Sequence, residues 1–121
     1  MNWRQALTEY YSSFGMAAYP QESVEEDAEF PWITYNMNRG DFGEETALTL
    51  HTHHYTSSEA IPNAKADEIV KSMRGGKMIH CDEGMMMIFP ALPEWLSAPD
   101  QNDKNHKHRI INATIHWLLT R

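Results

Sequence analysis

The sequence predicts an α+β domain: a single, mainly antiparallel sheet of about five strands, with two helices packed on one face. Two segments carry apolar residues at helical spacing, and at least five others are rich in β-branched and aromatic residues between turn signals. The chain has 121 residues, so we expect residues 1–121 to form a single domain. The expected order is one helix, two strands, a second helix and three strands.

The first helix is predicted near the start, in "NWRQALTEYYSSFG". Asn2 and Gln5 have the spacing of a capping box, and Gly15 is suited to ending the helix. One stripe at helical spacing holds its apolar residues, Trp3, Ala6, Leu7, Tyr10, Tyr11 and Phe14. The next segment, 16–29, has no periodicity and carries five acidic residues, so we expect a solvated loop.

A hairpin is predicted next, followed by the second helix. "FPWITYNM" (30–37) and "ETALTLHTHHYT" (45–56) read as antiparallel strands, joined by a turn containing Gly40 and Gly43. "NAKADEIVKSMRGG" (63–76) reads as a helix that ends at its two glycines. Its buried face should contain Ala66, Ile69, Val70 and Met73.

The remaining segments predict a second hairpin, a long loop and a last strand. "KMIHC" (77–81) and "MMMIF" (85–89) flank a turn at Gly84. Residues 90–107 contain three prolines and are expected to form a long irregular loop. "RIINATIHWLLT" (109–120) alternates apolar with polar residues and is rich in β-branched ones, which favours a strand over a helix.

The stretch "TLHTHHYTS" (49–57) holds three of the seven histidines and is the strongest candidate for metal chemistry. On a strand, His51 and His53 should share the face opposite Leu48 and Leu50, while His54 points the other way. A catalytic zinc needs three protein ligands, and only His80 or Cys81 is an evident third. We therefore expect no metal and no cofactor, with His51 and His53 as weak candidates on a polar sheet face.

Other features also argue against catalysis and against tight binding of nucleic acids. His80 and Cys81 are consecutive on a strand and face opposite ways, so they cannot form a nucleophile–base pair. A formal net charge of −7 does not favour tight binding to a phosphate backbone. The sequence has no apolar run of membrane-spanning length and no secretory signal, and its single cysteine excludes an internal disulfide. We expect a soluble, non-enzymatic protein made in the cytoplasm.

Apolar residues outside the periodic elements indicate assembly instead. Large exposed apolar patches are unusual on monomers. A head-to-tail ring would bury such patches between subunits. Tryptophan in particular is enriched at interface hot spots, and Trp95 is the expected anchor. The candidate interface residues are Met86, Leu92, Trp95 and Leu96.

Over most of its length the chain resembles the tail terminator proteins of long-tailed bacteriophages, also described as minor capsid or tail-joining proteins in phages and prophages of Gram-positive bacteria. The resemblance depends on the order and spacing of an aromatic first helix, "FPWITY" (30–35), "AKADEI" (64–69) and "RIIN" (109–112). Trp32 replaces the tyrosine expected there, and the "HTHH" cluster is not part of the pattern.

The resemblance implies a virion protein at the junction of tail and head. Such a protein forms a six-membered ring on the end of the tail tube, stops its polymerisation and presents the face that joins the head connector. Its partners would be further copies of itself, the major tail tube protein and the head connector proteins. DNA would pass through the ring without tight binding. A monomeric state of the isolated chain is compatible with this assembly, with rings forming at high concentration or on tubes.

Two other classes stay open. A head–tail connector, meaning a stopper or adaptor, or a tube-type subunit would share the size and acidity of this chain. A small metal-dependent enzyme using His51 and His53 is the less favoured alternative. Metal content separates that enzyme from the assembly proteins. The position in the virion separates the assembly proteins from one another.

Overall fold

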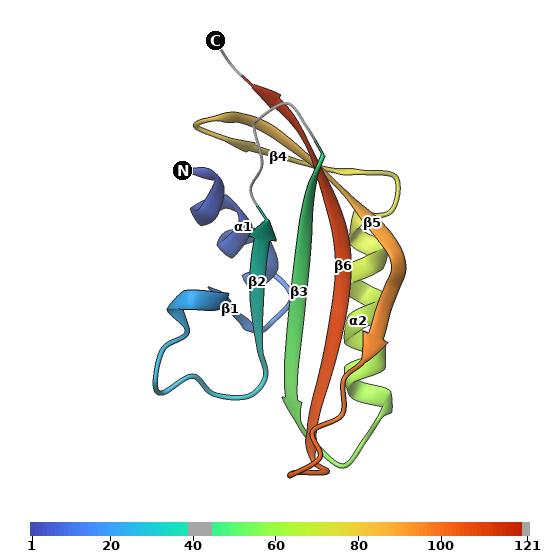
Figure 1. Cartoon of the computed structure of the whole chain (residues 1–121). Coiled ribbons are helices and arrows are strands. Elements are labelled where there is room, and N and C mark those ends of the chain that lie inside the picture. Colours follow the sequence, from blue (N-terminus) through green and yellow to red (C-terminus); the bar gives the residue numbers. More distant parts are fainter. Residues whose placement is uncertain (39–44, 120–121) are drawn as a thin grey trace.

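The computed structural model describes residues 1–38 and 45–119, and it forms an α+β fold around one mixed six-stranded sheet (Figure 1). The predicted turn with Gly40 and Gly43 lies outside the described residues. A short 3₁₀ turn, η1 (Gln21–Ser23), follows the first strand. The helices and strands are α1 (Trp3–Ser12), β1 (Ala17–Pro20), β2 (Trp32–Asn38), β3 (Thr46–Tyr55), α2 (Ala60–Met73), β4 (Lys77–Cys81), β5 (Gly84–Ser97) and β6 (His106–Leu119).

The strands lie in the order β1-β2-β3-β6-β5-β4, so the last strand of the chain is central (Figure 1). All neighbours pair antiparallel except β1, which runs parallel to β2. The prediction of a mainly antiparallel sheet of about five strands is thus confirmed in outline, with β1 as the additional strand. The segment 16–29 was wrongly predicted to be loop throughout, because four residues such as "AAYP" are too short to show a strand period.

Both helices form as the apolar spacing predicted, and they pack on the same face of the sheet. The Asn2 side chain accepts from the backbone N–H of Gln5, and the Gln5 side chain accepts from that of Asn2, which completes the capping box. The Tyr11 hydroxyl reaches the sulfur of Met73, so α1 contacts α2 directly. The predicted face of α2 is buried, at Ala66, Ile69, Val70 and Met73.

The segment 90–107 is not the long irregular loop that its prolines suggested. Strand β5 continues to Ser97, with a break in register between Pro90 and Trp95, and β6 begins at His106. Strand β4 pairs with β5 only as far as Ile88. Beyond that point β5 is an edge strand, where the missing N–H of a proline costs no ladder hydrogen bond.

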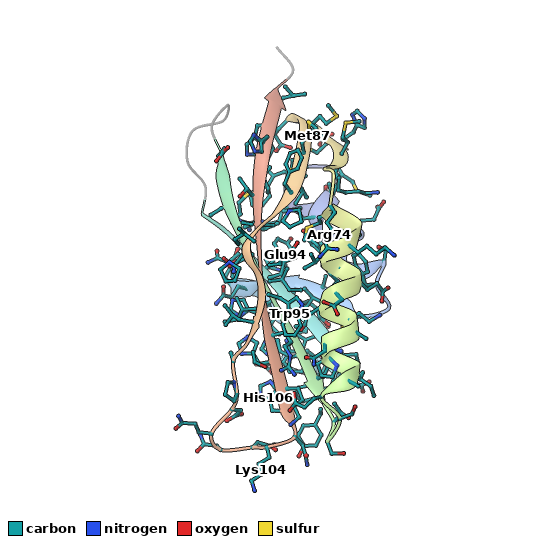
Figure 2. The ribbon with its side chains drawn as sticks, turned by 90° about the vertical axis from the view of Figure 1, so that its right-hand side faces the viewer. Arg74, Met87, Glu94, Trp95, Lys104 and His106 are labelled. Carbon is teal, nitrogen blue, oxygen red and sulfur yellow. The ribbon has the colours of Figure 1, made fainter. Side chains whose placement is uncertain are left out.

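One core lies between the sheet and the helices, and neither α1 nor α2 covers the opposite sheet face, here called the outer face. Figure 2 shows the sheet from its side, with α2 on the right. Alternate residues of β3 and β6 enter the core, among them Leu48, Leu50, Ile111 and Ile115. The residues between them, including His51 and His53, therefore lie on the outer face.

Candidate functional site

Two His-x-His pairs meet on the outer face, at one end of the central strands. Strands β3 and β6 are antiparallel, and His53 stands directly opposite His108 in their register. The rings of these two residues stack, with centroids 4.6 Å apart and planes inclined by 17°. The group is called the histidine cluster below and comprises His51, His53, His106 and His108.

Hydrogen bonds join the cluster diagonally across the two strands. Nδ1 of His51 lies 2.7 Å from Nε2 of His108, and Nδ1 of His53 lies 3.0 Å from Nε2 of His106. Nδ1 of His106 lies 3.0 Å from a carboxylate oxygen of Asp100. An ionised carboxylate only accepts, so His106 donates from Nδ1, and in the neutral form of the ring its Nε2 accepts from His53. The carboxylate of Asp100 thereby fixes the tautomer of His106, which in turn fixes the tautomer of His53.

Aromatic side chains enclose the cluster on the side of β2. Trp32 stacks on His53, with ring centroids 4.9 Å apart. Phe30 lies 4.3 Å from Trp32 and 5.5 Å from both Tyr55 and His106, measured between ring centroids. This surrounding removes water from imidazoles that a sheet face open to solvent would leave hydrated.

Three members of the cluster, His51, His53 and His108, favour the neutral form. Burial, reinforced by the neighbouring His108 and His106, lowers the pKa of His53 to about 3. Burial, with His51, His106 and Arg109 nearby, lowers the pKa of His108 to about 4, and burial also lowers the pKa of His51. Burial is the largest cause of each shift, because a charged imidazolium loses hydration on this face, and repulsion between charged neighbours adds to it for His53 and His108.

The fold should therefore lose stability in acid over a defined range of pH. An unfolded histidine has a pKa of about 6.5, so below that pH the unfolded chain binds more protons than the folded one. The stability that depends on neutral His53 and His108 is fully present above pH 6.5. It is lost progressively as the pH falls towards 4 and then 3. Thermal denaturation between pH 7.5 and pH 4 measures the effect as a falling Tm.

A His53→Gln, His108→Gln variant should show a clearly flatter dependence of Tm on pH, because glutamine does not titrate. His80→Gln with His116→Gln is the matched control, since both of these histidines lie outside the cluster. That control should keep the slope of the unmodified protein. Equal slopes in the cluster variant and the unmodified protein would contradict the assignment.

The fate of the predicted metal candidates differs from residue to residue. The orientation predicted for His51 and His53 is confirmed, and so is the inward orientation of His54, which is buried. His80 and Cys81 do not approach them: Cys81 pairs with Gly84, and Gly84 pairs with Leu119 at the far end of β6. His106 and His108 complete the cluster and were missed, because their "HKH" was assigned mostly to the loop.

The four predicted interface residues also fall into different environments. The prediction that Met86 is exposed is wrong: its side chain is 0% exposed and faces the helices. Leu92 is 90% exposed at the break in β5, and Leu96 is partly exposed on the outer face. Trp95 faces inward and packs against the core (Figure 2). Its Nε1 donates to a carboxylate oxygen of Asp67 on α2, at 2.8 Å.

Comparison with known proteins found no matching family model, no matching curated protein and no matching solved structure. Within the described residues, no helix combines the length and the apolar character needed to span a membrane.

Proposed function

We propose that this protein is a structural component of a bacteriophage virion, a tail terminator that forms a ring on the end of the tail tube. The ring stops polymerisation of the tube and offers the face that joins the head. The composition of the outer face carries the proposal, because a sheet face exposed to solvent normally has polar side chains. This one has exposed apolar side chains at one end and aromatic rings beside four histidines at the other.

The two ends of the outer face differ in chemistry. At the end near the β4–β5 turn, Met85 lies opposite Leu118, which is 54% exposed, and Met87 lies opposite His116. At the other end stand the histidine cluster and the exposed rings of Phe30 and Tyr55. Polar residues occupy the middle, with Thr49 opposite both Asn36 and Asn112. Two zones of different chemistry on one surface, one apolar and one aromatic, support contact with more than one neighbour.

Leu92 is a third exposed apolar site, and it lies on the free edge of β5. It projects where the register of β5 and β6 breaks, and β4 does not extend that far. A contact between this edge and a different surface of the next copy would be heterologous, the type of contact that closes into rings. Six copies, the number implied by the resemblance, would form the proposed ring.

The negative net charge of the chain is compatible with the same role. With a net charge of −7, a ring around the DNA path would repel the phosphate backbone rather than hold it. The proposed partners are the major tail tube protein on one side and head connector proteins on the other. The proposed location is the tail–head junction of the virion, with no catalytic role.

A polymerisation assay tests the proposal. The major tail tube protein of the same phage should be polymerised with increasing amounts of the protein, and tube lengths measured. A terminator shortens the tubes in proportion to its amount. Tubes of unchanged length, together with binding to isolated heads, would identify a head-side stopper or adaptor. Incorporation along the whole tube would identify a tube-type subunit.

A further inference from the structure

We propose that the histidine cluster on the outer face binds one divalent transition-metal ion, with zinc as the reference ion. The site would tie β3 to β6, the two central strands of the sheet. It is independent of the proposed role in the tail, and neither the resemblance nor the comparisons assign it.

The chemistry of the cluster fits this class of ion. Neutral imidazole nitrogens are preferred ligands of zinc, copper and nickel. Each strand supplies two histidines separated by one residue, so that both rings project from the same face. The four rings come from two adjacent strands, with neighbouring centroids between 4.6 and 6.5 Å apart. Magnesium and calcium, which prefer oxygen ligands, are not favoured here.

Asp100 supplies the orientation that metal-binding histidines usually have. Its carboxylate accepts from Nδ1 of His106 at 3.0 Å, which leaves Nε2 of the neutral ring with a lone pair aimed at His53. A carboxylate behind a histidine fixes the tautomer, orients the ring and makes the free nitrogen a better ligand. Asp100 is thus a positioning residue, and His106 the best oriented ligand of the cluster.

The distances describe the cluster before an ion enters. Two nitrogens bound to one tetrahedral zinc lie about 3.3 Å apart, given zinc–nitrogen bonds of about 2.05 Å. The pairs at 2.7 and 3.0 Å are closer than that because a proton joins them. An ion that enters the His53–His106 pair would need the proton to move from Nδ1 to Nε2 of His53, the two nitrogens to separate by a few tenths of an ångström and both rings to tilt so that their lone pairs meet at the ion.

A third ligand requires a ring to turn. No group of three or more His, Cys, Asp or Glu side chains in the described residues is arranged to hold an ion as it stands. The planes of His53 and His108 are inclined by only 17°, so the in-plane lone pairs of these two rings do not converge on one point. Rotation of a half-buried ring about its side-chain bonds would bring His108 or His51 to the ion. Water would fill any remaining position.

Calorimetric titration with zinc tests the proposal on untagged, chelator-treated protein at pH 7.5. We expect one ion per chain, and at least 100-fold weaker binding in a His53→Gln, His106→Gln variant. The matched control, His80→Gln with His116→Gln, also removes two histidines and should bind zinc like the unmodified protein. Cobalt should give the intense visible absorption of a tetrahedral site in the unmodified protein and the control.

Asp100→Asn separates a positioning role from a structural one. Loss of an orienting carboxylate typically weakens metal binding 10- to 100-fold. We expect that loss with an unchanged Tm of the metal-free variant, and this variant carries the test if the double histidine variant does not fold. Zinc binding by the double variant equal to that of the unmodified protein would overturn the proposal. Absence of stoichiometric binding to the unmodified protein, or an equal loss in the matched control, would also overturn it.

Discussion

Replacing Trp95 with alanine is expected to lower the free energy of unfolding by about 2–3 kcal/mol, somewhat less than the 3–5 kcal/mol typical of a fully buried tryptophan. The half-buried indole packs on the core, donates to Asp67 on α2 and lies 5.9 Å from the guanidinium of Arg109, measured to the ring centroid. Arg109 is only 2% exposed, so loss of the indole also lets water reach its buried guanidinium. Urea denaturation measures the change.

Trp95→Phe is the control, because it keeps most of the packed ring and removes the N–H donor. It should cost clearly less than the alanine change. If Trp95→Ala leaves stability unchanged, the inward packing of the indole is wrong, and the residue would return to its predicted place as an interface anchor. A tail defect in a phage carrying Trp95→Ala is otherwise expected to follow from a weakened fold.

A Leu92→Glu, Leu96→Glu variant is expected to abolish the proposed ring assembly while leaving the Tm within about 4 °C of the unmodified value, because each surface change usually alters stability by less than about 0.5 kcal/mol. Leu92 is 90% exposed and Leu96 is 38% exposed. Two carboxylates in an apolar contact would have to be desolvated without a partner, which an interface does not tolerate. Electron microscopy of the protein with tail tubes records the loss.

Ile61→Glu provides the matched control for this variant. Ile61 is also an exposed apolar residue, at 55%, but it lies on α2, away from the edge of β5. Rings should form normally with this change. Assembly that survives in the leucine variant, or that fails equally in the Ile61 variant, would remove Leu92 and Leu96 from the proposed contact.

Local periodicity predicted most of the fold. The capping box at Asn2 and Gln5, the apolar face of α2 and the strand nature of β6 all follow from spacing that a few neighbouring residues define. The sheet face on which each methionine of "MMMIF" lies could not be predicted in this way, because methionines at three successive positions are equally apolar on either face. The pairing of Gly84 with both Cys81 and Leu119 accompanies the register that turns Met86 inward.

Proline content was a poor guide to the path of β5. Pro90 and Pro93 are tolerated because the strand has a free edge there, and a free edge is a property of the whole sheet that no local pattern contains. The inward position of Trp95 follows from its pairing with Ile111 across that irregular stretch. Leu96, one residue further, accordingly pairs with Ile110 on the outer face.

Part of the histidine cluster could be predicted from the sequence. Both "HTH" (51–53) and "HKH" (106–108) have strand spacing, and each predicts a pair of imidazoles on one face. Their meeting depends on the antiparallel pairing of β3 with β6, which are separated by a helix and a hairpin in the chain. That long-range register could not be read from either motif alone.

Electron microscopy of tube ends is the most direct test of the proposed function. Tail tubes should be assembled from the proposed partner, the major tail tube protein of the same phage, incubated with this protein and imaged, with ends classified and averaged. The proposal predicts a closed ring of this protein at one end of each tube, and no further growth from that end when tube protein is added. Bare ends that continue to elongate in the presence of excess protein would contradict it.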